Sequence, residues 1–346
     1  MALNLPIAPH EATKMVLKKL SSKRMRDVLE KRYGLKGRSH LTLEAIGQEY
    51  KITRERVRQI ENDALRHIAK PEHLQEVDPL YRVIEAEIGN RGGVMAEHHL
   101  FSMLAEDRYH PHLGLLLSIG ERFRPVAEDD RHHNRWTLEK TAAKEVERVM
   151  DRTVEELERS GKTVSAEELK ALVARAAKEV TGRESEPHIV ETYLATSKLI
   201  RKNPYNEYGL VGWPTISPSG VKDKAYAVLM RAGHPVHFRE VARAIDEAHW
   251  SKRKAHPQTV HNELIKDKRF VLVGRGLYAL GEWGYEPGVV RDVIASVLKS
   301  AKHAMTREEI IDATLGKRMV KVPTILLNLQ NRSLFRRTDD GKYRLA

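Results

Sequence analysis

The stretch TLEAIGQEYKITRERVRQIENDALRHIAK, residues 42–70, predicts two helices joined by a tight turn. The first helix has an apolar face formed by Leu43, Ala45, Ile46 and Tyr50. Gly47 lets a second helix pack closely against it, and Lys51 and Ile52 form the predicted turn. Thr53 is a suitable N-cap for the second helix, because its hydroxyl can accept a hydrogen bond from a free backbone N–H group.

The second helix of this pair is amphipathic and unusually basic. Its apolar residues recur with the period of a helix and are Val57, Ile60, Ala64, Leu65 and Ile68. Its other face begins with five polar residues, Arg54, Glu55, Arg56, Arg58 and Gln59. Such side chains can hydrogen-bond to base edges or bind phosphates, and a polar first turn is where a recognition helix enters the major groove. The pattern therefore predicts a DNA-binding helix-turn-helix.

The same residues resemble region 4 of primary-type bacterial sigma factors, the module that reads the promoter −35 element. The resemblance extends upstream through LSSKRMRDVLEKRYGL, residues 20–35, and covers about residues 11–70. It implies that Arg54, Glu55 and Gln59 face base edges and that Arg56 and Arg58 contact bases or phosphates. It also implies DNA-backbone contacts from Lys31, Arg32, Arg38 and Lys51. Members of this family dock region 4 on the flap of the RNA polymerase β subunit, so core polymerase is an expected partner.

Two alternatives remain open for this module. The basic helix can serve solubility alone, or the fold can be retained while binding protein instead of DNA. Sigma factors also carry a promoter-melting region before region 4, whereas only about ten residues precede the resemblance here. We therefore expect region 4 within another architecture and not a complete sigma factor.

Charge and composition favour a polyanionic partner. The chain has 346 residues and a net charge of +12, with +7 in residues 10–73 and +5 in residues 220–285. This distribution predicts two nucleic-acid-binding faces in a scaffold that is otherwise neutral in sum, although ordinary charge variation is an alternative. The chain has no cysteine, which excludes disulfides and thiol chemistry. No apolar run reaches the length of a membrane span, so we expect a cytoplasmic, nucleoid-associated protein with no membrane partner.

A pattern recurs four times after the first module. Its instances are MAEHHL at 95–100, VSAEEL at 164–169, VHFREV at 236–241 and MTREEI at 305–310. Each is preceded by a helical stretch and followed by another helix and a strand–turn–strand ending. We predict a mainly α fold with small β-hairpin wings, in which four tandem winged helix modules follow the helix-turn-helix.

The predicted borders follow these repeats. The helix-turn-helix module occupies residues 11–73, and the winged helix modules occupy residues 78–138, 141–214, 220–285 and 286–346. Tandem domains are favoured over a stacked solenoid, because each repeat has its own hairpin and apolar faces. The sequence PTISPSG, residues 214–220, is predicted to be a linker.

The third repeat, residues 220–285, resembles the HARE-type helix-turn-helix domain. That family includes the amino-terminal domain of the RNA polymerase delta subunit, which binds polymerase, so DNA binding by this repeat is not implied. Its predicted recognition helix is residues 257–267, with Val260, Leu264 and Ile265 in the core. The DNA-binding candidates are Gln258, Thr259, His261, Asn262 and Lys266, with Arg275 in the wing. Alternatively, this helix only packs the core and leaves a solvated face.

The other repeats carry weaker signals. In the fourth repeat, residues 321–332 form a comparable helix, and Arg336, Arg337 and Lys342 can flank a phosphate. Whether this repeat contacts DNA or does not is equally open. The first has mixed charge, which fits a protein contact or a scaffold role. The second begins with a long helix over residues 141–161 that alternates Glu and Arg, a pattern typical of a solvated face or a spacer.

Catalytic motifs are missing from the sequence. There is no phosphate-binding glycine loop, GxSxG or HExxH, and the histidine pairs 98–99 and 132–133 are poorly placed to chelate a metal. We expect no enzyme activity, no cofactor and no metal. The favoured function is a sequence-specific regulator that reads a −35-like element in double-stranded promoter DNA together with RNA polymerase. The alternatives are a polymerase accessory protein with weak or non-specific DNA binding, and a nucleoid or defence-island DNA-binding protein that acts without polymerase.

Overall fold

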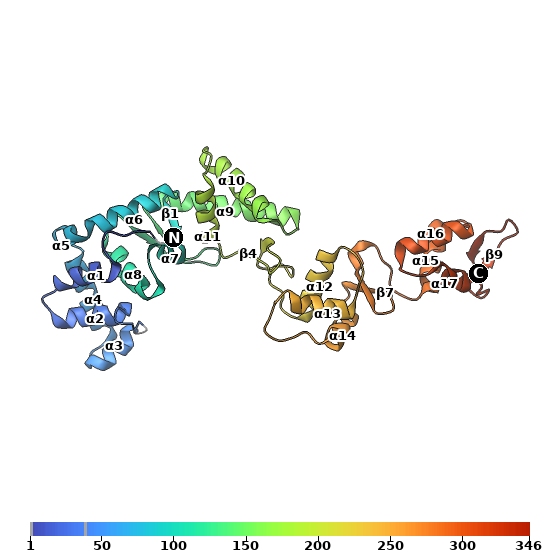
Figure 1. Ribbon diagram of the computed structural model, residues 1–346, viewed down its shortest axis with the longest axis horizontal. Helices are drawn as coiled ribbons and strands as arrows, with labels where there is room; N and C mark the ends of the chain where they lie inside the picture. Colours follow the sequence, from blue (N-terminus) through green and yellow to red (C-terminus); the bar gives the residue numbers. More distant parts are fainter. Residues whose placement is uncertain (1–2, 38–39) are drawn as a thin grey trace. The chain divides into compact units, whose positions relative to one another are not determined.

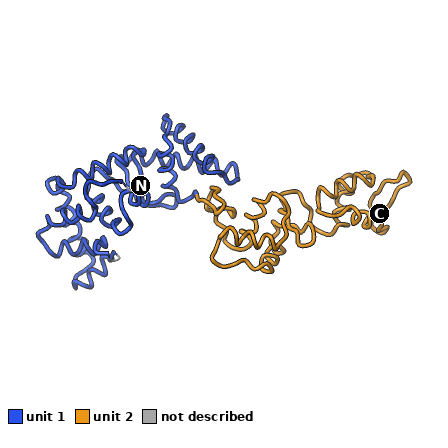
Figure 2. Tube along the Cα trace, in the orientation of Figure 1, with its two compact units in different colours: residues 1–200 blue, residues 201–346 orange. Residues whose placement is uncertain are grey.

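The computed structural model describes residues 3–37 and 40–346, and these are mainly helical with small antiparallel sheets (Figure 1). The chain divides into two compact units, residues 1–200 and residues 201–346 (Figure 2). Among the described residues, no helix is both long enough and apolar enough to cross a membrane. Arg38, one of the predicted DNA-backbone contacts, lies outside the described residues.

Unit 1 begins with four helices, of which the last two are those that residues 42–70 predict. They are α1 (Pro9–Lys18), α2 (Lys23–Tyr33), α3 (Leu43–Tyr50) and α4 (Arg54–Ile68), followed by α5 (Pro71–Leu74) and η1 (Gln75–Val77). Thr53 is confirmed as the N-cap of α4, because its hydroxyl accepts a hydrogen bond from the Arg56 backbone N–H. A small core of Val28, Ile46, Val57 and Ile60 joins α2, α3 and α4.

A helix–strand–helix–helix–hairpin segment follows in the same unit. Its elements are α6 (Asp78–Asn90), β1 (Val94–Ala96), α7 (Glu97–Leu104), η2 (Asp107–Tyr109), α8 (His110–Ile119), β2 (Arg124–Val126) and β3 (Arg135–Thr137). The three strands form an antiparallel sheet in the order β1-β3-β2, in which Thr137 lies opposite both Val94 and Arg124. This is the order of elements that the first repeat predicts.

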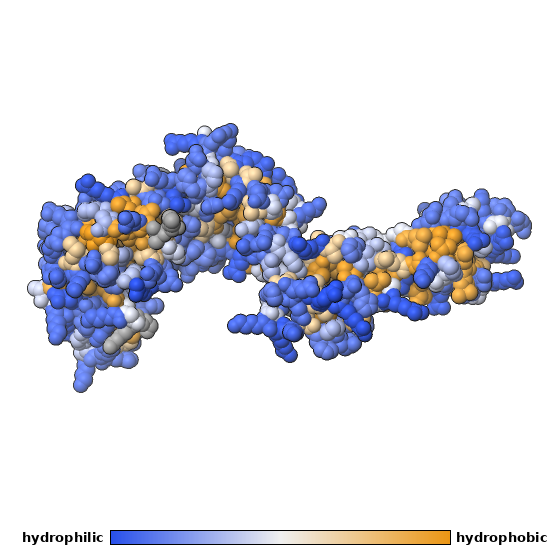
Figure 3. Space-filling model, viewed as in Figure 1, coloured by the Kyte–Doolittle hydropathy of each residue, from blue (hydrophilic) through white to orange (hydrophobic). Residues whose placement is uncertain are grey.

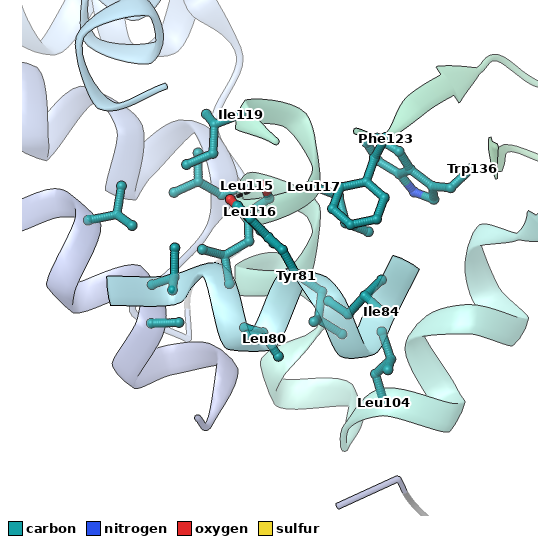
Figure 4. Packing of buried hydrophobic residues seen from close by; sticks show 14 of the residues in the cluster. Leu80, Tyr81, Ile84, Leu104, Leu115, Leu116, Leu117, Ile119, Phe123 and Trp136 are labelled. Carbon is teal, nitrogen blue, oxygen red and sulfur yellow. Dashed lines mark hydrogen bonds between the residues drawn. The ribbon is translucent and has the colours of Figure 1, made fainter. Parts of the chain in front are cut away.

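The first two predicted modules share one hydrophobic core. The cluster joins Leu17 and Ile68 of the helix-turn-helix segment to Leu80 and Leu116 of the next segment. Helix α8 lies at its centre, since its buried leucines contact α1, α2, α4 and α7. Figure 4 shows Tyr81 among these leucines, where its hydroxyl donates a 2.8 Å hydrogen bond to the Leu116 carbonyl. Residues 11–138 therefore pack as one body, in which α2, α3 and α4 keep a small core of their own beside the shared one.

Three further helices complete unit 1. They are α9 (Lys140–Ser160), α10 (Ala166–Thr181) and α11 (Pro187–Thr196). The long α9 is not a free spacer: it packs along α10 and buries Val146, Val149, Met150, Val154 and Leu157. Ser165 and Glu168 form a capping box at the start of α10. The second repeat departs from the others because Val164 forms only an isolated bridge at the position of the first strand.

The predicted linker at residues 214–220 is packed instead of free. It follows strands β4 (Ile200–Lys202) and β5 (Tyr208–Leu210), which lie where the two units divide. Ile216 is 4% exposed, and the buried Asn203 side chain donates to the Thr215 carbonyl at 3.1 Å. A Cβ at Gly209 would lie 2.7 Å from the Trp213 ring. The prediction relied on Pro, Ser and Gly content, which does not reveal that Ile216 and Trp213 anchor the segment.

The third predicted module, residues 220–285 in unit 2, has the same order of elements as the first repeat. They are α12 (Val221–Ala232), β6 (Val236–His237), α13 (Phe238–Glu247), α14 (Pro257–Lys266), β7 (Phe270–Gly274), β8 (Leu277–Leu280) and η3 (Gly281–Trp283). The sheet order is β6-β8-β7. Val260 and Leu264 are buried as predicted, but the prediction for Ile265 is wrong, because its side chain is 62% exposed. The apolar period of α14 places Ile265 one position past the buried stripe.

The last segment is built on a separate small core. Its elements are α15 (Val290–Ala301), α16 (Arg307–Lys317), α17 (Val322–Leu329), β9 (Phe335–Arg337) and β10 (Tyr343–Leu345). The core consists of Ile294, Leu298, Ile310, Ile325, Leu329 and Phe335. Met305 forms a single bridge to Tyr343 where the other repeats have a first strand. Thr306 caps α16 in a capping box with Glu309.

Candidate nucleic-acid interface

The turn between α3 and α4 fixes how the candidate recognition helix is presented. A Cβ at Gly47 would lie 2.7 Å from the Ile52 carbonyl oxygen, so only glycine permits this approach of helix and turn. Lys51 ends α3 in the left-handed conformation, with a φ of 54°. The Lys51 side chain is exposed at this turn, and Thr53 then starts α4. The sequence thus sets α4 at a fixed angle with its first turn in solvent.

The structure brings together the five polar residues predicted on α4. Arg54, Glu55, Arg56, Arg58 and Gln59 are all exposed on the first two turns. Glu55 accepts two hydrogen bonds from Arg58, at 2.9 and 2.7 Å, and Arg56 donates to Gln59 at 2.9 Å. The hydrogen bond from Arg58 holds the pKa of the Glu55 carboxyl below its usual value, so this side chain is an acceptor at neutral pH. Within the described part of the chain, Arg54 has no ion pair or hydrogen-bond partner for its side chain.

These pairs orient the side chains without locking them. Exposed ion pairs one turn apart on a helix contribute little to stability, so a base edge or phosphate can replace either partner at small cost. The face then offers guanidinium donors for guanine or phosphate, an amide for adenine and a carboxylate for cytosine. Such a set of groups can distinguish base pairs.

Two residues predicted near the DNA backbone are used inside the module. Lys31 forms ion pairs with Asp27 at 2.9 Å and with Glu49 at 2.5 Å, which link α2 to α3. The hydrogen bond to Glu49, followed by that to Asp27, raises the pKa of Lys31. The same cluster includes the Tyr50 hydroxyl, which donates to Asp27. Lys31 thus has acidic partners within the fold, and its contact with the DNA backbone stays a prediction.

Arg32 has a comparable structural role. Its guanidinium donates to the Leu41 carbonyl at 3.1 Å and lies 3.3 Å from the Glu61 carboxylate. It therefore ties α2 both to the segment before α3 and to α4. The sequence resemblance could not show this, because the internal acidic partners of α2 are distant in sequence.

Helix α14 forms the second candidate face. Gln258, Thr259, Asn262 and Lys266 are exposed, and the Gln258 amide donates to Asn262 at 3.2 Å. His261 differs, because its ring packs 4.5 Å from that of Phe238 and is partly buried. The loop before α14 adds three exposed cations, Lys252, Arg253 and Lys254. The structure therefore gathers four of the five predicted helix residues on one open face and turns His261 towards the core.

Arg275 lies at the turn of the β7–β8 hairpin and is exposed. The next residue, Gly276, has a φ of 69°, and a Cβ there would lie 2.5 Å from the His237 ring. The tight turn thus depends on glycine and leaves Arg275 exposed, and the contact of Arg275 with DNA stays a prediction. None of the described residues form a group of three or more His, Asp or Glu arranged to hold a metal.

The third helices of the three similar segments differ in what they expose. In α8, Leu115 and Leu116 are fully buried against the helix-turn-helix segment, so this helix has no free face for DNA. In α14 the outward residues are polar. In α17 the outward residues include Leu327, which is 67% exposed, and Val322. Among these three, only α14 has the exposed polar face of a recognition helix.

Charge is distributed differently from the prediction. The windows 10–73 and 220–285 are basic as counted, but the remainder is not uniformly neutral. Residues 286–346 carry 12 Lys and Arg against 7 Asp and Glu, or +5, and residues 74–219 carry 20 against 25, or −5. The net charge is therefore +11 over residues 201–346 and only +1 over residues 1–200. The charges of residues 74–219 and 286–346 cancel in the sum, so the sequence count did not reveal that residues 286–346 are a third basic region.

Comparison with known proteins places a family match on the first candidate face. Residues 16–70 match the family described as Sigma-70, region 4. The chain is 56% identical over 50 residues to the RNA polymerase sigma factor SigA of Nostoc sp., which is 14% of this chain and 13% of that protein. It is 42% identical over 62 residues to the RNA polymerase sigma factor RpoD of Neisseria gonorrhoeae, which is 18% of this chain and 10% of that protein.

These relatives are matched over a small part of their length. The chain spans about an eighth of the Nostoc protein and a tenth of the Neisseria protein. The family match ends at Lys70, two residues beyond the end of α4 and before the segment whose leucines cover α1 and α4. The chain therefore carries a sigma-70 region 4 domain at residues 16–70, the segment that contains α2, α3 and α4.

Proposed function

We propose that this protein is a DNA-binding transcription regulator that acts with RNA polymerase at promoters and reads a −35-like element through α4. One observation carries the proposal: the region 4 domain presents Arg54, Glu55, Arg56, Arg58 and Gln59 together on the open first turns of α4. The matched relatives are named as RNA polymerase sigma factors, and they match this chain over 50 to 62 residues. The protein works in the cytoplasm at the nucleoid, as a binding protein without a cofactor or an enzymatic reaction.

The later segments fit winged helix modules in this proposal. The order helix, strand, helix, helix, hairpin in residues 78–138 and 220–285 supports it, and so do the sheet orders β1-β3-β2 and β6-β8-β7. In the HARE-like module, α14 and Arg275 extend the contact with DNA. The first winged helix has a different role, because α8 is buried and supports the region 4 domain.

Contact with polymerase, including the β flap, is part of the proposal. The apolar faces of α1 and α4 are already buried against α8 through Leu17, Ile68 and Leu116. A polymerase subunit must therefore contact other surfaces of the region 4 domain unless α8 moves away.

A second function is favoured by the last segment. Figure 3 shows apolar surface on this part of unit 2, and Leu327, Met319 and Val322 are among its exposed apolar residues. An exposed apolar helix face is more typical of protein contact than of base readout. This observation supports the alternative, a polymerase accessory protein with little sequence-specific DNA binding.

Selection of bound sequences from a random duplex library by the full chain separates the two functions. We expect an enriched motif that is lost in an R54A/Q59A variant, because each base contact contributes about 1–3 kcal/mol of discrimination. The matched control is R66A, which removes a cation from the far end of the same helix, where Arg66 is 78% exposed. The control should keep the motif. If the unaltered protein enriches no motif, the promoter-reading function is wrong, and retention of core polymerase by the protein tests the accessory function.

A further inference from the structure

The hairpin formed by β9 and β10 places two arginines directly opposite each other. In its register Arg336 pairs with Arg344, so both side chains project from the same face of the two-stranded sheet. Directly opposed residues in an antiparallel pair have Cα atoms about 4.5–5.5 Å apart, and like charges there are destabilising. Across residues 3–37 and 40–346, no carboxylate forms an ion pair with either arginine. The hairpin thus carries a repulsion that the fold itself does not relieve.

The equivalent hairpins show that this arrangement is not required by the fold. In β7–β8 the opposed residues are apolar, as in Leu272 with Tyr278. In β2–β3, Arg135 lies opposite Val126, and its charge is met by ion pairs with Glu147 and Asp129. Only β9–β10, of these three hairpins, opposes two cations without an acidic partner.

Arg336, one member of this opposed pair, also lines a groove together with Arg332 and Arg337. The groove has a volume of about 900 Å³ and is lined by Leu329, Gln330, Arg332, Phe335, Arg336, Arg337, Tyr343 and Ala346. Its apolar part includes Leu329 and Phe335, which are almost fully buried, while the Arg332 and Arg336 side chains are exposed. The nearest acidic residues in sequence lie in the hairpin turn, where Asp340 already accepts from Thr338 and lies 3.6 Å from Lys342. The side chains that line the groove therefore include three guanidinium groups, those of Arg332, Arg336 and Arg337, and no carboxylate.

The chemistry of this surface fits phosphate groups. Guanidinium groups bind phosphate oxygens through paired hydrogen bonds and keep their charge at any physiological pH. An anion between Arg336 and Arg344 would convert their repulsion into attraction. An extended polyanion is favoured over a short acidic peptide, because the +11 charge of residues 201–346 extends over both segments of unit 2.

We propose that Arg332, Arg336 and Arg344 form a sequence-independent site for the phosphate backbone of duplex DNA. The proposal rests on the DNA-binding function proposed above. Region 4 selects the sequence, and this site adds affinity without reading bases. It is distinct from α14, since its cations lie on the β9–β10 hairpin and in the turn before it.

The test measures the affinity of the full chain for a labelled duplex of random sequence at a series of salt concentrations. The variant is R336Q/R344Q, and the matched control is R152Q/R175Q, which removes the same charge from two exposed arginines of α9 and α10. Each phosphate contact contributes about 0.9 to the slope of log affinity against log salt. We expect the slope to become shallower by about 2 in R336Q/R344Q and to stay unchanged in the control. Equal slopes in the two variants would overturn the proposal.

Three further measurements keep the outcome interpretable. The melting temperature of R336Q/R344Q should equal or exceed that of the unaltered protein, because the substitutions remove a repulsion. The DNA motif that R336Q/R344Q selects should be the same as that of the unaltered protein. If the unaltered protein itself selects no motif, the promoter-reading function is wrong, and this result is separate from the test of the arginine site. A polyglutamate peptide serves as the competing ligand: if R336Q/R344Q loses binding to polyglutamate while duplex binding and its salt slope stay the same, the site takes an acidic protein partner and the DNA proposal is wrong.

Discussion

At the scale of single residues, Gly47 shows how one position controls the recognition helix. The sequence predicts that it allows close packing, and the structure gives the reason, since the Ile52 carbonyl would lie 2.7 Å from an added Cβ. A backbone atom cannot move aside as a flexible side chain can. We expect Gly47→Ala to destabilise unit 1 by about 1–3 kcal/mol, measured by chemical denaturation. DNA affinity should fall as well, because α4 is displaced.

The control for this substitution is Gly89→Ala in α6. Its nearest neighbour, the Leu138 side chain, would lie at an ordinary 3.7 Å, and the position is helical. Alanine there should be neutral or slightly stabilising, because glycine is a poor helix former by about 1 kcal/mol. Equal destabilisation by both substitutions would show that the turn does not constrain α4.

Other residues show where sequence reasoning stops. Thr53, Ser165 and Thr306 were predictable as N-caps, because capping depends on neighbours three positions away. Lys31 and Arg32 show the limit of local rules, since Asp27 is a local partner of Lys31 but Glu49 and Glu61 lie 18 and 29 positions further along the chain. The opposition of Arg336 and Arg344 depends on strand register, which the sequence pattern does not specify. Helix caps and exposed helix faces can therefore be predicted from neighbouring residues. Which charged side chains remain unpaired depends on residues that are distant in sequence.

At the scale of elements, one arginine couples the helices that position α14. Arg269 lies 2.8 Å from Asp223 of α12 and 2.7 Å from Asp267, the residue that follows α14. Asp267 has its pKa lowered chiefly by the hydrogen bond from Arg269. For Asp223, burial alone would raise the pKa, but hydrogen bonds from Ser219 and Arg269 outweigh it and the pKa is lowered. Both carboxylates thus depend on Arg269.

We expect Arg269→Gln to destabilise unit 2 by about 2 kcal/mol, because it leaves two largely buried carboxylates without their cation. Both folded-state pKa values lie below the ordinary aspartate value of 3.8. Their stabilisation is therefore complete above that pH and is lost as the pH falls through the lowered values. Acid titration of the variant should show a smaller loss of stability below about pH 4 than the unaltered protein.

Arg243→Gln is the comparison for this prediction. Arg243 and Glu247 form a 3.7 Å pair on α13 in which both side chains are about 70% exposed, so its loss should change stability by less than about 0.5 kcal/mol. A similar loss of stability in both variants would show that Arg269 has no special role in holding Asp223 and Asp267.

At the scale of the whole molecule, the sequence repeats predicted the order of helices and strands better than they predicted which segments share a core. Helix and hairpin positions follow from local periodicity and caps, so the order of elements in residues 78–138 and 220–285 was accessible. The shared core of the region 4 domain and the next segment was not, because an all-apolar run such as Leu115–Leu117 does not reveal what covers each face. The leucines of α8 are buried from two sides, which joins two predicted modules into one body.

This division of the chain leads to a prediction about the separate units. We expect fragments 1–200 and 201–346 to fold independently, because each has its own hydrophobic clusters. The first fragment, with a net charge of +1 and the region 4 domain, should select a DNA motif with modest affinity. The second, with a net charge of +11, should bind any duplex with a steeper salt dependence and no motif.

A third fragment, residues 78–200, serves as the control for the shared core. It lacks the helices that cover α8, so the buried leucines become solvent-exposed, and we expect aggregation or loss of cooperative melting. If this fragment melts as cooperatively as residues 1–200, the region 4 domain is not part of that folding unit. If residues 201–346 select the motif instead, base readout belongs to α14, and the assignment of sequence recognition to α4 is wrong.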